Sequence, residues 1–184
     1  MCIRDSYKTL DIYASERLLV RKTGVGLKAT LTDKNAATNQ VVFHFSLKNN
    51  FKDWDFYLPY ILGVMSSRIM FAYHLRKSGE SEWRSHPYVT PKTLRGLPIP
   101  VPEQGTQNWI QAHMIAQLVR QHLKTGGRDN SLDLKIECLV AGLFDMSSDD
   151  IVWTKHVISS AQDLEPMRAL SAFDETSVSA ERVQ

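Results

Sequence analysis

The first part of the chain has the alternating pattern of a small β unit. Residues 17–23 are rich in apolar and branched side chains, residues 27–32 alternate apolar with polar ones, and residues 41–47 form a third apolar run. The Gly-Val-Gly at 24–26 marks a turn, and the polar, Asn-rich residues 33–40 mark a loop. The pattern predicts three short strands.

After residue 57 the apolar period becomes helical. Apolar side chains recur at three- and four-residue spacing over residues 57–77, and Arg76 and Lys77 fall in the last turn, where cations suit the helix dipole. We expect one long helix there, packed behind the sheet. The LRGLPIPVP segment at 94–102 holds three prolines and is predicted to be extended.

Further helices are predicted in the remainder of the chain. Apolar spacing indicates helices over residues 107–124, 132–144 and 147–157, the last opening on a serine cap followed by Asp149 and Asp150. The sequence therefore predicts an α+β fold.

Four segments follow from these patterns. We expect a mixed β unit with its long packing helix in residues 16–106 and a C-terminal helical subdomain in residues 107–160. Residues 161–184 are expected to form a flexible tail. Residues 1–15 open on MCIRDS, which resembles the read-through start of reading frames assembled from environmental sequence, so we expect a non-native or linker remnant and a parent protein that begins upstream.

Composition excludes several classes of protein. With 43% hydrophobic and 23% charged residues in 184, the chain reads as globular, and no apolar run is long enough for a membrane span. Arg4 is not followed by an apolar run, so we expect no secretory signal. Cys2 and Cys138 make neither a disulfide framework nor a zinc site, which favours a reducing, cytoplasmic location, with Cys138 a buried free thiol.

The net charge of +2 hides an asymmetry. Residues 1–100 hold fifteen Lys and Arg against eight Asp and Glu, a charge of +7, whereas residues 101–184 hold seven against twelve, a charge of −5. A basic half favours a polyanionic partner, although a solvated basic surface has the same composition.

Motifs for catalysis are absent from the sequence. The six histidines have no metal-ligand spacing, Asp149 and Asp150 fit a helix N-terminus, and no nucleophile elbow occurs. We therefore expect no catalytic and no metal-binding residues on this chain.

Basic residues interleaved with aromatic ones remain as the candidate chemistry. Arginine forms bidentate contacts with guanine or phosphate, and aromatic rings stack on exposed bases. The alternative is a solvated loop whose Trp83 and Tyr88 pack against the core. Arg17 lies in the same cluster, and the candidate DNA-binding residues are Arg21, Lys22, Lys28, Lys34, Arg76, Lys77, Arg84, Lys92 and Arg95.

Three blocks, in a fixed order, carry a resemblance to a known family. They are residues 16–24 with 27–33, residues 57–74 with LRGLPIPVP at 94–102, and residues 134–157. Together they resemble the entry strands, the leucine-rich helix with its proline segment, and the closing signature of the TaqI-like C-terminal specificity domain. That domain is the target recognition domain of adenine-specific DNA methyltransferases and type IIG restriction-modification enzymes.

The sequence departs from that family at several positions. Val64-Met65-Ser66-Ser67 stands where Leu-Asn-Ser is common, Glu137 replaces an aspartate, and Phe144-Asp145 replaces Tyr-Gly. The NPPY tetrapeptide and the glycine-rich cofactor motif of the catalytic domain do not occur here. The resemblance implies that the partner is double-stranded DNA. It also implies a methyltransferase domain missing upstream, with S-adenosylmethionine as that domain's cofactor.

Two other functions compete with this interpretation. Residues 132–157 could form a helix-turn-helix of a repressor or adaptor, although the second helix starts with acids where it would meet phosphate. A magnesium-dependent nuclease could use Asp33, Asp53 and Asp55. For the recognition domain, we expect DNA contacts from the β unit and residues 76–95, and not from residues 107–157.

Overall fold

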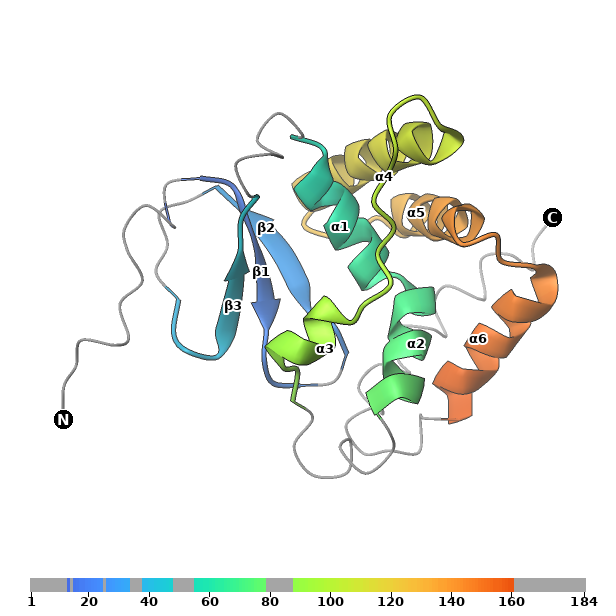
Figure 1. Cartoon of the computed structure of the whole chain (residues 1–184), viewed down its shortest axis with the longest axis horizontal. Helices are drawn as coiled ribbons and strands as arrows, with labels where there is room; N and C mark the ends of the chain where they lie inside the picture. The colour runs from blue at the N-terminus through green and yellow to red at the C-terminus, as the bar shows by residue number, and fades with distance from the viewer. Residues whose placement is uncertain are drawn as a thin grey trace.

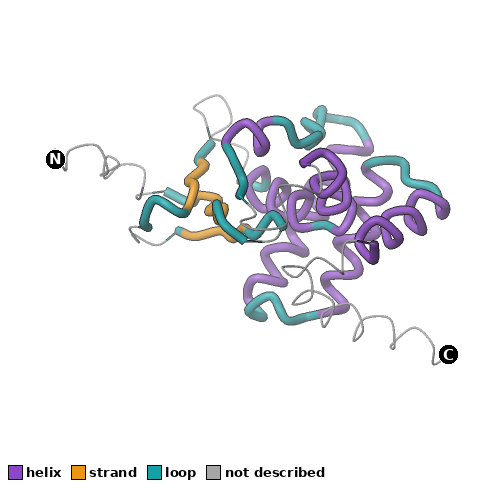
Figure 2. Tube along the Cα trace, turned by 90° about the horizontal axis from the view of Figure 1, so that it is seen from below, coloured by secondary structure: helices purple, strands orange, loops and turns teal. Residues whose placement is uncertain are grey.

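A computed structural model describes residues 13, 15–24, 26–33, 38–47, 55–78 and 88–160. Within this part of the chain, a three-stranded antiparallel sheet lies to one side of six helices, so the predicted α+β class is confirmed (Figures 1 and 2). None of the described helices is long and apolar enough to cross a membrane.

The sheet has one apolar and one polar face. The central strand β1 (Arg17–Arg21) pairs with β2 (Ala29–Thr32) on one side and β3 (Val42–Phe45) on the other. Leu18 and Val20 are buried against the helices, and the residues that alternate with them point to the opposite face. The three strands therefore lie within the predicted segments and are shorter than them.

The predicted long helix over residues 57–77 is wrong, because the chain breaks at Ser67. α1 (Tyr57–Ser66) ends there, α2 (Arg68–Ser78) begins beyond it, and Ser67 itself is extended with ψ of 152°. The Ser67 hydroxyl donates to the Val64 carbonyl at 2.8 Å and accepts from the Met70 N–H at 3.1 Å. One side chain thus closes the first helix and caps the second.

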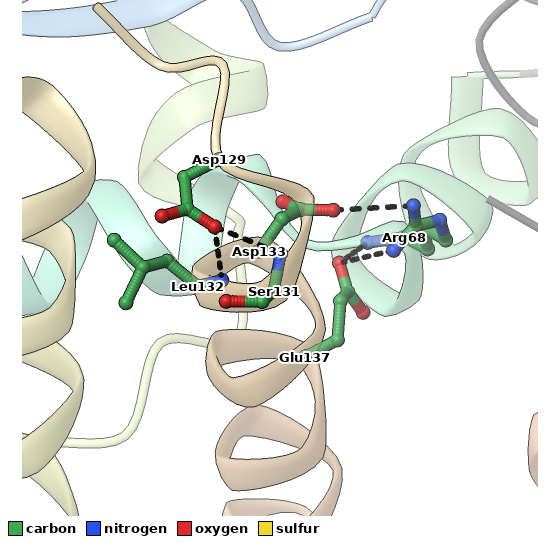
Figure 3. Close-up of polar contacts among 6 residues, drawn as sticks. All are labelled: Arg68, Asp129, Ser131, Leu132, Asp133 and Glu137. Carbon is green, nitrogen blue, oxygen red and sulfur yellow. Dashed lines mark hydrogen bonds and ion pairs between the residues drawn. The ribbon is translucent and has the colours of Figure 1, made fainter. Parts of the chain in front are cut away.

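A carboxylate from a distant helix secures this junction (Figure 3). Glu137, in α5 (Asn130–Leu143), accepts the backbone N–H of Arg68 at 2.6 Å. The Arg68 guanidinium lies 3.7 Å from Glu137 and 3.2 Å from Asp133. A negative charge at a helix N-terminus is favourable, so α5 fixes where α2 starts.

The C-terminal helices agree closely with the sequence pattern. α4 (Gln107–Lys124) has the predicted bounds, and the bounds of α6 (Ser148–Ser160) and of α5 each differ from the predicted ones by only a few residues.

α4 packs closely on α1 at Gly63, where an added Cβ would lie 2.6 Å from Ile115 Cγ2 and 2.9 Å from Val119 Cγ2. One hydrophobic cluster spans the sheet, α1, α4 and α5. The division at residue 107 stays a prediction.

A short helix, α3 (Pro91–Arg95), was not predicted. Its start has a local signal, because the Thr90 hydroxyl accepts the Thr93 N–H at 3.1 Å and Pro91 occupies the first turn. α3 includes Leu94 and Arg95, so the prediction that residues 94–102 are extended is wrong at these two positions. The rest of the proline segment is non-helical, and the Tyr60 hydroxyl holds it by donating to the Pro100 carbonyl at 2.8 Å.

Cys138 is a free, exposed thiol, so the prediction of a buried one is wrong. In α5 the buried positions are Ile136, Val140 and Leu143, and helical geometry turns residue 138 away from that face. The thiol lines a shallow apolar groove of about 480 Å³ between α4 and α5.

The buried His74 makes the stability of the protein depend on pH. Burial lowers the pKa of His74 from its ordinary value of 6.5. The unfolded chain therefore takes up this proton first as the pH falls, and the free energy of unfolding falls below pH 6.5, by at most about 1.4 kcal/mol per pH unit. In urea denaturation at neutral and mildly acidic pH, wild type should lose more stability than His74→Gln. An equal loss in both proteins would contradict this assignment.

Candidate nucleic-acid interface

Two of the candidate cations face each other across the hairpin of β1 and β2. The Arg21 N–H donates to the Lys28 carbonyl at 2.9 Å, one step beyond the paired Val20 and Ala29. Cross-strand neighbours share a face, and Val20 is buried, so both cations project from the face turned away from the helices. Both side chains are exposed to solvent.

α3 is tied to the same end of the sheet. Thr23 forms a bridge with Tyr88, and the Val89 N–H donates to the Lys22 carbonyl at 2.7 Å. α3 starts two residues later and carries the exposed Lys92 and Arg95. Residues more than sixty positions apart in the chain thus meet beside the tip of β1 (Figure 1).

α2 also lies beside this end of the sheet. Gly26, with φ of +76°, lies against the ring of Phe71, where an added Cβ would be 3.1 Å from the ring. α2 also contacts the end of α3, because the Tyr73 hydroxyl donates to the carbonyl of Gly96, the residue after α3, at 3.4 Å. In Figure 1 the end of α2 lies at the same lower end as α3 and the turn after β1. We call this end, with Arg21, Lys22, Lys28, Arg76, Lys77, Lys92 and Arg95, the basic end.

No cation of the basic end forms an ion pair with a described carboxylate. Some instead lie against aromatic side chains. Lys22 Nζ is 4.7 Å from the Phe43 centroid, and Lys77 Nζ is 5.4 Å from that of Tyr73, whose hydroxyl it also contacts at 2.9 Å. Aromatic contacts orient a cation without neutralising it. The carboxylates in the described part of the chain therefore leave these charges unneutralised.

Other arginines are engaged within the protein. Arg120 forms a bidentate pair with Glu16, at 2.8 and 3.0 Å, and Arg68 is held by Glu137 and Asp133. Arg17 is completely buried and donates to the carbonyls of Tyr13 and Ser15. The structure thus separates structural arginines from those of the basic end.

Lys34 and Arg84, with Trp83, lie outside the described residues, so the structure does not place them. Of the aromatic pair expected near them, Tyr88 is 54% exposed rather than packed in the core. The sequence missed Trp153 of α6, which lies against Arg76.

The acids proposed for a nuclease are not shown to converge. Asp33 follows β2, Asp55 precedes α1 with its carbonyl accepting from Arg120, and Asp53 lies outside the described residues. A cavity of about 440 Å³ between β2, α1, α4 and α5 is lined in part by Asp133 and Glu137. Both carboxylates pair with Arg68. Among the described residues, no group of three or more His, Cys, Asp or Glu could hold a metal ion.

Comparison with known proteins identifies the family. Residues 3–99, more than half of the chain, match the TaqI-like C-terminal specificity domain. A comparison with curated proteins found no significant match. The matched part includes the sheet, α1, α2 and α3, whereas residues 134–157 lie beyond it. The chain therefore belongs to the TaqI-like C-terminal specificity domains, the DNA-recognition domains of restriction-modification enzymes.

Proposed function

We propose that this chain selects the target site for an adenine-specific DNA methyltransferase, or for a fused enzyme that also cleaves DNA. The observation that carries the proposal is the basic end, where candidate cations from the sheet, α2 and α3 lie together without carboxylate partners among the described residues. The catalytic domain, encoded upstream, would hold S-adenosylmethionine and the target adenine.

The arrangement suits the two tasks of a recognition domain. Flexible cations at the edge of a rigid support bind phosphates and fix the register on the duplex, and side chains between them read base edges. The sheet supplies that support, because its other face is packed against the helices. Lys92 and Arg95, on α3, would extend the phosphate contacts away from the sheet.

The proposal predicts a steep dependence of DNA affinity on salt. Each phosphate that a cation neutralises contributes about 0.9 to the slope of log affinity against log salt concentration. We expect the full chain to bind a short mixed-sequence duplex weakly, with a slope of at least about 3 between roughly 50 and 200 mM salt. Fluorescence anisotropy measures it. A flat salt response would contradict a phosphate-contacting surface.

The parent activity has a separate test. We propose that the genomic sequence upstream encodes NPPY in frame with this chain. The parent enzyme should then transfer methyl groups from S-adenosylmethionine to adenine in duplex DNA. Methylation of cytosine by the parent, or a parent without a methyltransferase domain, would refute this assignment and leave the DNA-recognition function intact.

A further inference from the structure

We propose that α6 forms part of the DNA-binding surface, with Trp153 holding Arg76 in position for a phosphate. This inference rests on the proposed function and extends it beyond the matched residues, which end at residue 99. It also differs from the sequence-based expectation that residues 107–157 make no DNA contact. The juxtaposition that carries it joins the last turn of α2 to the middle of α6.

The contact itself is a cation on an aromatic face. The Arg76 guanidinium carbon lies 5.7 Å from the Trp153 ring centroid, within the range of cation–π attraction, and both residues are exposed to solvent. Of the described carboxylates, none forms an ion pair with Arg76. Asp149, one turn before Trp153 on α6, also makes no ion pair with it. No described carboxylate therefore neutralises the charge of Arg76.

Packing of the core does not account for Trp153. α6 is anchored by its buried residues Thr154, Val157 and Ile158, which lie on one face of the helix. Trp153 is not part of the hydrophobic core cluster, and 49% of it is exposed. A large ring left at the surface needs another reason, and its contact with Arg76 provides one.

The contact with the ring affects what the guanidinium can do. A ring accepts no hydrogen bond in the guanidinium plane, so the N–H groups of Arg76 keep the fork that binds a phosphate through two hydrogen bonds. Holding the side chain in advance lowers the entropy lost on binding. Lys77, in the same turn, is held separately, because its Nζ donates to the Tyr73 hydroxyl at 2.9 Å.

Four variants of the full chain test the proposal against the same mixed-sequence duplex. We expect Arg76→Ala to lower affinity and flatten the salt slope by about one unit, and Trp153→Ala to lower affinity roughly threefold to tenfold. In the double variant, loss of Trp153 should add little to loss of Arg76, because the ring acts through the guanidinium. Val152→Ala is the matched control, since Val152 is the neighbouring exposed residue, at 65%.

The outcomes separate this inference from the proposed function. Additive losses in the double variant, or wild-type affinity for Trp153→Ala, would overturn the role of α6 while leaving the basic end in place. Loss of affinity in Val152→Ala equal to that in Trp153→Ala would overturn it too, because it would indicate a general effect on α6. Absence of duplex binding by the wild type would overturn both. Thermal unfolding of each variant checks that the fold is retained.

Discussion

Replacing Arg21, Lys28 and Lys92 together with glutamate should weaken duplex binding by about a hundredfold near 0.1 M salt. Each residue is exposed and belongs to the basic end, and none forms an ion pair with a described carboxylate. Loss of three phosphate contacts should also flatten the salt slope by about three units. Anisotropy titrations over a range of salt concentrations measure both quantities.

A matched variant shows whether position or net charge matters. Three other cations are also exposed but lie away from the basic end: Lys124 in α4, Arg128 in the connection after it, and Lys135 in α5. Reversing these three changes the net charge equally and should reduce affinity only slightly. Equal losses in the two triple variants would mean that DNA senses only the overall charge, and the interface assigned to the basic end would be wrong.

Glu137→Ala should lower the free energy of unfolding by about 2–3 kcal/mol. Its carboxylate accepts the backbone N–H that starts α2, and it pairs with the Arg68 side chain. Removing it leaves a partly buried amide without that partner, which costs more than the loss of a solvent-screened ion pair. The Glu137 side chain is only 16% exposed, so water replaces it poorly. Chemical denaturation measures the change.

Two neighbouring variants isolate the cause of that loss. Glu137→Gln keeps an oxygen for the Arg68 amide and should retain most of the stability. Asp133→Ala removes a more exposed partner of the same guanidinium and should cost less than about 1 kcal/mol. If Asp133→Ala were as damaging as Glu137→Ala, the ion pair and not the backbone contact would hold the junction.

Local sequence determined most elements of the fold and failed where distant residues decide. Residues 107–124 have apolar side chains at helical spacing and follow a capping threonine, Thr106, so their helix is predictable from this stretch of sequence alone. The break at Ser67 is not predictable in this way, because serine is tolerated within helices. The carboxylate that accepts the first N–H of α2 belongs to Glu137, 69 positions after Arg68. α3 has only five residues, too few for a period to show.

The same division applies to the candidate interface. Residue type and spacing identified the cations, but they could not tell which are neutralised. Arg120 pairs with Glu16 across 104 positions, and Arg17 is buried and donates to the carbonyls of Tyr13 and Ser15, whereas Arg21 in the same strand stays exposed. The pairing of Arg76 with Trp153 joins the basic and acidic halves of the chain, so a charge count along the sequence could not reveal it.

The close approach at Gly63 limits how this domain can be exchanged between enzymes. The matched residues end at Ile99, yet the methyls of Ile115 and Val119 press against α1 from beyond that limit. If only the residues up to 99 were transferred to another enzyme, the apolar side of α1 would lose α4 and would face a helix of the new host. The side chains of that helix would not match the surface at Gly63. Chimeric enzymes built to acquire a new target sequence should therefore carry α4 and α5 along with the strands.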